Sequence, residues 1–282
     1  MDTAGSKSVS SDIAGGLARY HYQPLSDKRS LRLLDISRFA QQGTCALQEF
    51  GASSCPPYTA LSYTWGPPLA TAECISEYDN IEMQLKLREG STSFRDMNVL
   101  KNLHDGLRQL ALDQSITYLW VDAVCINQED IDEKQAQVAC MGDIYAGSEK
   151  VVVWLGQDNS NLDNFIWLHA TLVPILCEHV SRHDLTALLE PAWSPLKLKY
   201  KFGVDVPQTV WTSCDAFFVQ RKWFHSSWIF QEVALAPVIT VFCGHIELDW
   251  DAMQFLAGFI HESGLGAQLG IERHLHTKGM LE

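Results

Sequence analysis

The chain has 282 residues, of which 46% are hydrophobic, and a formal net charge of −13. This length and apolar content are those of a globular protein with one large domain or two small ones. The negative charge and the lack of a run of lysine or arginine argue against binding to nucleic acid or to an anionic membrane surface, because both need a basic face.

Cysteine usage and apolar runs indicate the compartment. The eight cysteines include no pair separated by only two residues, so the usual zinc-binding spacing is absent. Cys125 and Cys140 lie within apolar or helical patterns, which favours reduced thiols inside a cell. Residues 1–19 are rich in Ser, Gly and Ala, and no apolar run approaches the roughly 20 residues that span a bilayer. We therefore expect a flexible leader over 1–19 and a soluble, cytoplasmic protein.

Short apolar segments alternate with helical patterns along the chain. Residues 31–36 and 45–50 predict an N-terminal edge hairpin with Gly43 in its turn. Buried strands are predicted after it at residues 60–63, 118–121, 151–155 and 238–242. Helices are predicted between and after these strands at residues 98–112, 130–147, 227–236 and 251–261. Within the second helix, Asp130 and Glu133 have the spacing of a capping box.

Three other segments depart from this alternation. Residues 69–97 are polar and predict a solvated excursion, and residues 157–220 predict an inserted helical lobe whose first helix is interrupted near Pro174. Residues 263–282 show no clear pattern and are assigned to a C-terminal segment or the start of a linker.

The order of strands and helices predicts an α/β fold with a doubly wound, mostly parallel sheet. Right-handed crossovers would place the carboxyl ends of the strands at 60–63, 118–121 and 151–155 along one edge. Polar and aromatic residues are concentrated in three segments, at residues 58–66, 119–128 and 223–232. Since strand ends at such an edge carry the chemistry of many α/β proteins, we expect the functional site there.

Glu232 is the first candidate for chemistry. On a helix it lies four residues after Trp228 and on the same side, whereas Ile229 and Val233 can face the sheet. Desolvation would raise the pKa of Glu232 and the nearby helix N-terminus would lower it, so the direction of the net shift stays open. Spacing alone favours the alternative, a solvated acid beside a core tryptophan.

The other polar candidates follow the predicted strands. Asp122 could bind a ribose hydroxyl, as strand-end acids do in nucleotide-binding folds, or accept hydrogen bonds from its own loop. Asn127 and Gln128 more often hold loop backbone than a ligand. After the first core strand, Ser62, Tyr63 and Trp65 offer a hydroxyl and two rings that could stack on a flat ligand, with core packing as the alternative for Trp65; Gly66 serves the turn.

Several common signatures are missing. The sequence contains no P-loop, no dinucleotide-binding Gly-x-Gly-x-x-Gly after a strand and no Gly-x-Ser-x-Gly elbow. His179 and His183 lie four apart but lack the glutamate of a metalloprotease motif, which favours a surface pair over a metal site. We expect neither a metal nor a bound cofactor.

The three polar and aromatic segments resemble the heterokaryon-incompatibility (HET) domains of filamentous fungi. The middle of the chain is the most specific part, with Asp-Ala-Val-Cys-Ile-Asn-Gln, Glu-Lys-Gln-Ala-Gln-Val, Met-Gly-Asp-Ile-Tyr and Val-Val-Val-Trp-Leu-Gly in succession. The resemblance runs from about residue 20 to residue 262, so the HET domain is assigned to 20–262 with the 157–220 lobe inside it. It implies a role in fungal non-self recognition and programmed cell death.

The HET family is considered a distant relative of Toll/interleukin-receptor (TIR) domains, which implies a TIR- or flavodoxin-like sheet. TIR enzymes carry a tryptophan and, four positions later, a catalytic glutamate at the start of a helix; Trp228 and Glu232 match that spacing. By this similarity Glu232 becomes the favoured catalytic residue. This chain departs from the family at Ser226, where HET domains usually have arginine. If that arginine binds a substrate phosphate or pairs with the glutamate, its absence would weaken the activity. Ser226 could instead cap the helix.

Two functions follow from the resemblance. The first is an NAD glycohydrolase, which cleaves the nicotinamide–ribose bond through an oxocarbenium-like transition state. The resemblance also implies that it acts as a homo-oligomer and that an upstream recognition protein or domain activates it. NAD would be its substrate, and no separate cofactor is implied. The residues assigned to substrate binding are Ser62, Tyr63, Trp65, Gly66, Asp122, Asn127, Gln128 and Trp228. The alternative is a non-catalytic oligomerisation and signalling module, and a weaker third option is nucleotide sensing without turnover.

Overall fold

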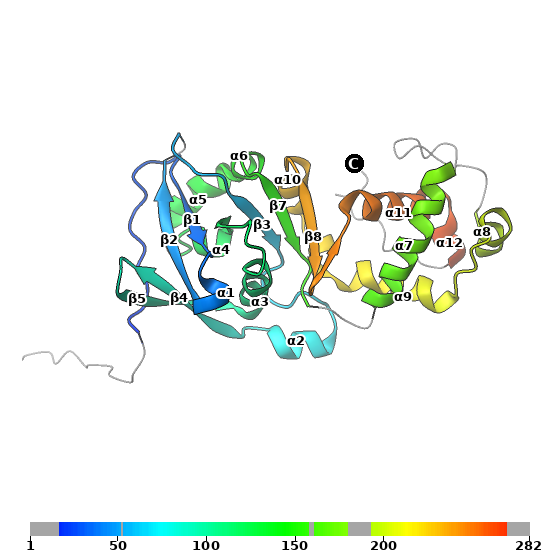
Figure 1. Cartoon of the computed structure of the whole chain (residues 1–282), viewed down its shortest axis with the longest axis horizontal. Coiled ribbons are helices and arrows are strands. Elements are labelled where there is room, and N and C mark those ends of the chain that lie inside the picture. Colours follow the sequence, from blue (N-terminus) through cyan, green and yellow to red (C-terminus); the bar gives the residue numbers. More distant parts are fainter. Residues whose placement is uncertain (1–16, 52, 158–160, 180–192, 270–282) are drawn as a thin grey trace, which may run out of the picture.

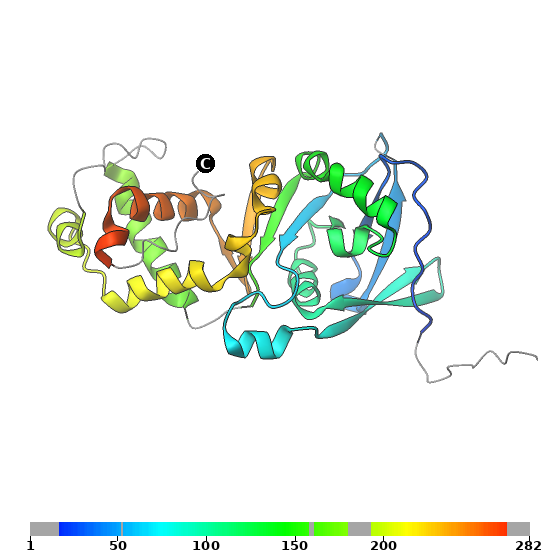
Figure 2. The same cartoon turned by 180° about the vertical axis from the view of Figure 1, so that it is seen from behind.

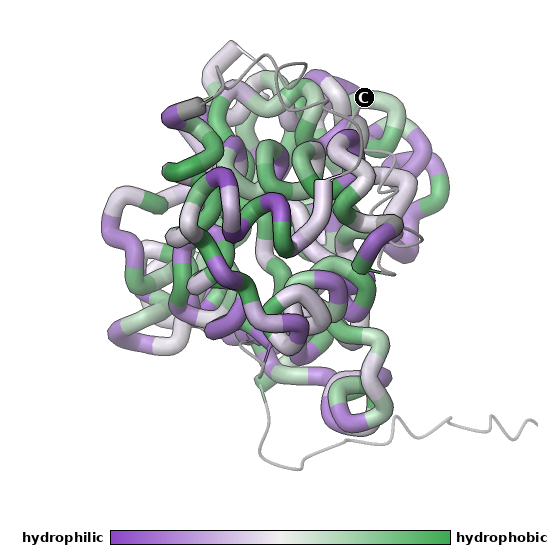
Figure 3. The backbone as a smooth tube through the Cα atoms, turned by 90° about the vertical axis from the view of Figure 1, so that its right-hand side faces the viewer, coloured by the Kyte–Doolittle hydropathy of each residue, from purple (hydrophilic) through white to green (hydrophobic). Residues whose placement is uncertain are grey.

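A nine-stranded sheet forms one half of the molecule, and a lobe of helices forms the other (Figure 1). The computed structural model describes residues 17–51, 53–157, 161–179 and 193–269. None of the helices in these ranges combines the length and apolar character needed to cross a bilayer. Along most of the chain, hydrophobic and hydrophilic residues alternate at short intervals (Figure 3), as expected of elements that bury one side.

The centre of the sheet is parallel. The strands are β1 (Leu31–Asp35), β2 (Thr44–Phe50), β3 (Thr59–Tyr63), β4 (Glu82–Glu89), β5 (Ser93–Leu100), β6 (Tyr118–Trp120), β7 (Lys150–Trp154), β8 (Ile239–Cys243) and β9 (Ile246–Leu248). Their order across the sheet is β5-β4-β2-β1-β6-β3-β7-β8-β9. The adjacent strands β6, β3, β7 and β8 all run parallel, whereas β1 is antiparallel to β6 and β9 is antiparallel to β8. The predicted α/β class and its four core strands are confirmed, but the sheet as a whole is mixed rather than mostly parallel.

The predicted hairpin of β1 and β2 forms, but it does not lie at the edge of the sheet. The segment at 69–97, which we expected to be a solvated excursion, instead builds a helix and most of an outer hairpin of β4 and β5, and β4 pairs with β2. In β4, Leu85 and Leu87 are buried between exposed neighbours, which is a strand pattern of period two. The acidic composition of the segment obscured that pattern.

The helices before β7 are α1 (Phe39–Gln42), α2 (Ala72–Tyr78), α3 (Lys101–Leu110), α4 (Asp122–Cys125), α5 (Ile131–Ala139) and α6 (Met141–Ala146). The helix predicted over 98–112 is shorter because 98–100 complete β5, and the one predicted over 130–147 is divided at Cys140. Helix α10 (Ile229–Ala234) packs against α6, and both lie with α5 over the face of the sheet seen in Figure 2. The indole of Trp154 points to the opposite face, where it contacts α3 at Gly106.

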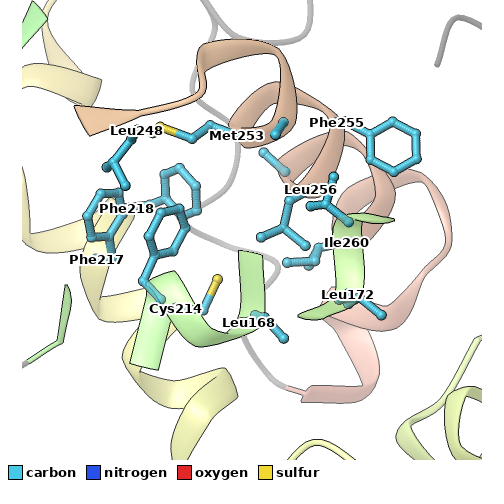
Figure 4. Close-up of a cluster of buried hydrophobic side chains, with 14 of the residues drawn as sticks. Leu168, Leu172, Cys214, Phe217, Phe218, Leu248, Met253, Phe255, Leu256 and Ile260 are labelled. Carbon is cyan, nitrogen blue, oxygen red and sulfur yellow. The ribbon is translucent and has the colours of Figure 1, made fainter. Parts of the chain in front are cut away.

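The helical lobe contains α7 (Leu162–His179), α8 (Pro195–Phe202) and α9 (Gln208–Gln220), and they pack with α11 (Trp250–Glu262) and α12 (Leu265–Leu269). Leu168 and Leu172 of α7 face Phe217 of α9 and Leu256 of α11 in one apolar cluster (Figure 4). The expected interruption near Pro174 is wrong, because α7 continues through it. Pro174 lies on the exposed side of the helix, where water can reach the carbonyl left without a donor. The proposed division of the chain into leader, domain and C-terminal segment remains a prediction.

The carboxyl ends of β3 and β7 are joined by a buried amide and a glycine. Asn102 of α3 donates to the Thr64 carbonyl at 2.7 Å and accepts from the Trp154 indole at 2.9 Å. Just after β7, Gly156 has φ of +90°, and a Cβ built on it would lie 2.6 Å from Cγ of Pro68 and nearer still to its Cβ. The loop after β3 therefore packs directly on the backbone that leaves β7.

We expect Gly156→Ala to destabilise the fold by about 2 kcal/mol more than Gly203→Ala. Both glycines have positive φ, so both alanine variants bear left-handed strain, but only position 156 also meets the proline ring; Gly203 has open space around it. Urea unfolding of the two variants measures the difference. Equal losses of stability would contradict the close packing of the β3 loop on β7.

Candidate functional site

Two residues 170 positions apart meet at the carboxyl end of β3. Ser62, which is 1% exposed, donates a hydrogen bond to the side-chain carboxylate of Glu232 in α10. The indole N–H of Trp223, in the short 3-10 helix η2 (Lys222–His225), donates to the same Ser62 hydroxyl at 2.7 Å. The predicted first and third segments are therefore in direct contact.

Asp122 belongs to the same group of side chains. It begins α4 immediately after β6, and its carboxylate accepts from the Ala123 amide at 2.7 Å and from the Trp65 indole at 3.1 and 3.2 Å. Asp122 thus binds its own loop, as one alternative predicted, and also links the loop after β6 to the loop after β3. Trp65 is 47% exposed, so the alternative of core packing, which the sequence left open for it, is wrong.

Burial controls the charge of both acids. It raises the pKa of Glu232 to about 7; the hydrogen bond from Ser62 opposes this rise and the charge of Asp122 adds to it. Burial also raises the pKa of Asp122 to about 6, against the bonds from Ala123 and Trp65 and the positive charge of Lys134. Desolvation therefore exceeds the effect of the Ser62 hydrogen bond, so the pKa of Glu232 is raised, a direction that the sequence left open. The charge of Asp122 makes a smaller contribution to the same rise.

Two tyrosines form the wall of this site. Burial and the charges of Asp122 and Glu232 raise the pKa of Tyr63 well above its usual range, and the same causes act on Tyr145 of α6. Tyr63 was a predicted site residue, whereas Tyr145 was not. Gly66 has φ of +77°, which confirms its role in the turn after β3.

Asn127 and Gln128 hold the loop between α4 and α5. The Asn127 side chain accepts from the Glu129 amide at 3.2 Å, and the Gln128 side chain donates to the Asp122 carbonyl at 2.9 Å. Both also line a pocket of about 330 Å³ next to the N-terminal segment. Glu232 lines none of the four pockets identified in the described part of the chain. Gln128 thus contacts the Asp122 backbone and Asn127 holds the backbone of its own loop, and among the described hydrogen bonds neither side chain bonds Glu232.

A buried ion pair holds the loop between α4 and α5 in place. Arg32 of β1 bonds both carboxylate oxygens of Glu133 at 2.6 and 2.9 Å, and the side chains are only 4% and 8% exposed. Glu133 also accepts from the Asn127 amide at 2.7 Å. The predicted capping box is therefore only half formed: Asp130 accepts from the Glu133 amide, but the Glu133 carboxylate is used by Arg32 and Asn127.

The start of α10 presents Trp228 beside Glu232. Ile229 and Val233 are buried, while Trp228 is 50% exposed, as expected if the two pairs lie on different sides of the helix. Ser226 accepts from the Trp228 amide at 3.4 Å, but Trp228 itself is the N-cap residue. Ser226 thus supports the turn before α10 and does not cap the helix directly.

Sequence reasoning missed Trp223 as a member of the site. Its position inside the third aromatic segment was visible, but no pattern in the sequence shows that its N–H reaches Ser62. Among the described side chains, no group of three or more His, Cys, Asp or Glu could hold a metal ion. The His179 and His183 side chains lie outside those that the structure describes.

The site joins two acids of raised pKa with exposed indoles, at the carboxyl edge of parallel strands in an α/β fold. A family model described as "Heterokaryon incompatibility protein (HET)" matches residues 58–232, which is more than half of the chain and includes all three predicted segments. The chain belongs to the HET family, as the resemblance indicated.

The chain is also similar to "Heterokaryon incompatibility protein 6, OR allele" of Neurospora crassa, with 29% identity over 285 residues. The match covers 91% of this chain and 39% of that relative, so the chain spans about two fifths of its length. No solved structure matches the chain.

We expect Glu232→Gln to stabilise the protein at alkaline pH. The pKa of Glu232 is about 7 in the folded protein, above the value of about 4.3 in an unfolded chain. The folded state therefore holds the proton more tightly than the unfolded state, and the free energy of unfolding of wild type falls as pH rises between these values. Glutamine stays neutral and can still accept from Ser62. The free energy of unfolding of Glu232→Gln minus that of wild type should therefore increase by up to about 3 kcal/mol between pH ~4 and pH ~8.

Urea unfolding across this pH range measures the effect. Glu129→Gln provides the control, because the Glu129 side chain is 78% exposed and pairs only with an exposed arginine. A wild-type protein that becomes more stable relative to Glu232→Gln as pH rises would contradict the burial of this carboxyl group.

Proposed function

We propose that this HET domain hydrolyses NAD at the nicotinamide–ribose bond and thereby takes part in fungal non-self recognition and cell death. The observation that carries the proposal is the partly buried Glu232 carboxyl group, which is held by Ser62 at the end of β3 and has a pKa raised to about 7 by desolvation. Acids perturbed by burial in this way are concentrated in functional sites, because an ordinary surface acid needs no such environment.

The position in the sheet supports a ligand site. Taken in chain order, the four parallel strands β3, β6, β7 and β8 are arranged second-first-third-fourth across the sheet. This is the flavodoxin-like order, in which ligands bind outside the carboxyl ends of the first and third strands. Ser62 lies near the end of β3 and pairs with Val153 of β7, so Glu232 lies at that point. The arrangement supports the TIR- or flavodoxin-like fold that the resemblance implied.

The chemistry of NAD suits a single carboxylate. As the bond from C1′ of the ribose to the nicotinamide nitrogen breaks, its electron pair leaves with nicotinamide and positive charge develops on the ribose. Water then adds to C1′ and loses a proton, giving ADP-ribose. The leaving nicotinamide is neutral, so it needs no general acid. Ionised Glu232 would stabilise the developing charge and hold ribose hydroxyls.

Other groups of the site fit the remaining parts of NAD. Trp65 and Trp228 are each about half exposed and offer flat faces for a nicotinamide or adenine ring. Asp122 can accept from a hydroxyl. Other HET domains usually carry arginine at the position of Ser226. In this chain Lys134, whose positive charge acts on Asp122, is a cation that could attract the phosphates of NAD.

One observation favours the alternative, a non-catalytic module. Leu235 and Val238 at the end of α10 are 48% and 56% exposed, and Trp228 at its start is equally open. Exposed apolar residues on one short segment suit a surface for a second copy or an upstream partner. Self-association is therefore compatible with both functions and does not by itself decide between them.

A turnover assay tests the enzymatic proposal. Purified protein is incubated with NAD at rising protein concentration, and nicotinamide release is followed for wild type, Glu232→Gln and Glu232→Ala. We expect turnover in wild type and its loss, by about 100-fold or more, in both variants, because the charge that stabilises the transition state is gone. The rate should rise with pH through about 7 as the pKa of Glu232 requires.

Two other results of this assay would favour the non-catalytic module or a weakened enzyme. Absence of nicotinamide release at every concentration and pH, from a folded and self-associating protein, would favour the signalling module. Ser226→Arg then distinguishes a weakened enzyme from a domain that lacks the activity, since restored turnover is expected only for the former.

A further inference from the structure

We propose that Trp223 is a positioning residue, which acts through Ser62 to hold Glu232 as an ionised, hydrogen-bond-accepting group. The inference rests on the proposed function only for its consequence in catalysis. The hydrogen-bond geometry that carries it is independent of any substrate.

Three side chains form a short chain of hydrogen bonds. The Trp223 indole N–H lies 2.7 Å from the Ser62 hydroxyl oxygen, and that hydroxyl is bonded to the Glu232 carboxylate. Trp223 and Ser62 are both buried, so water does not compete for these bonds. The indole is also fixed in direction, because Phe224 and Trp250 pack against it edge to face at centroid distances of 5.2 and 6.1 Å.

The chemistry of the indole determines the direction of the chain. An indole N–H can only donate a hydrogen bond, whereas a serine hydroxyl can donate one and accept others. Ser62 must therefore accept from Trp223, and its own proton is left for Glu232. Both forms of Glu232 can accept this bond, but an ionised carboxylate accepts it more strongly than the carbonyl oxygen of a protonated carboxyl group, because charge-assisted hydrogen bonds are stronger than neutral ones.

The surroundings otherwise favour the neutral acid. The groups that act on Glu232 are the charge of Asp122 in α4 and the apolar burial of the site, and both raise its pKa; the Ser62 hydrogen bond lowers it. Tyr63 of β3 and Tyr145 of α6 are neutral, and Lys134 of α5 acts on Asp122. The chain from Trp223 thus supplies the opposing effect that keeps a fraction of Glu232 ionised near neutral pH.

Removing only the N–H donor tests this inference. In Trp223→Phe the hydroxyl of Ser62 can rotate and accept from a protonated Glu232, so the neutral form gains. We expect the pKa of Glu232 to rise by about 1 unit in this variant and at least as much in Ser62→Ala. The measurement is the pH titration of ¹³C-labelled glutamate side chains by NMR, with the Glu232 resonance assigned by its loss in Glu232→Gln.

A matched control and an isosteric replacement make the result specific. Trp211 is also fully buried in the helical lobe, but its indole N–H has no hydrogen-bond partner among the described residues. Trp211→Phe should therefore leave the Glu232 titration unchanged. If Trp223→Phe fails to fold, benzothienylalanine at position 223 keeps the bicyclic ring without the N–H and should give the same shift.

Activity provides a second readout. In Trp223→Phe the pH midpoint of kcat/KM should move up with the titration, and kcat/KM should approach the wild-type value well above the new midpoint. Loss of activity by the same factor at every pH would indicate a merely structural role and overturn the inference. An unchanged pKa of Glu232 in the variants that lack the indole N–H would also overturn it. If wild type shows no turnover, the proposed function fails, and the titration still decides the role of Trp223.

Discussion

The hydrogen bond between Ser62 and Glu232 is the contact on which the site depends. It brings β3, from the first third of the chain, against α10, which follows the whole helical lobe. A carboxylate taken out of water needs such partners, because an unsatisfied buried charge is very costly. Asn102 and the close packing of Pro68 on Gly156 hold the ends of β3 and β7 in place. Together they keep Ser62 where Glu232 can reach it.

Two glutamates in this protein contrast in a way that favours function for one of them. Glu133 is compensated by a two-pronged bond to Arg32, an arrangement that holds a loop in place. Glu232 is partly buried, and among the described residues its carboxylate bonds the Ser62 hydroxyl and lies near a second acid, Asp122. A fold under selection for stability alone would not retain the second arrangement, since a neutral residue there would cost less. Acids whose pKa is raised in this way are concentrated in functional sites, which supports the proposed role of Glu232.

Much of the centre of the molecule could be predicted from the sequence. The core strands were visible as uninterrupted apolar runs, and Ser62 and Asp122 were candidates as polar residues at strand ends. Glu232 became the favoured residue only through the resemblance to TIR enzymes. The outer strands β4 and β5 were missed because charged and polar residues are frequent in them and only alternate residues of β4 are buried. Trp223 was missed, and the choice between ring stacking and core packing stayed open for Trp65, for a related reason: exposure and hydrogen bonding of an indole depend on contacts between distant segments, which a single sequence does not encode locally.

The central claim is that three distant segments form one NAD site around Glu232. It is tested most directly by titrating ¹⁵N-labelled Glu232→Gln, which should bind NAD without hydrolysing it, and following the tryptophan indole resonances. The account predicts that NAD shifts the signals of Trp65 and Trp228 and leaves that of Trp211 unchanged. No change in the signals of Trp65 and Trp228 at millimolar NAD, or changes confined to other tryptophans, would contradict it.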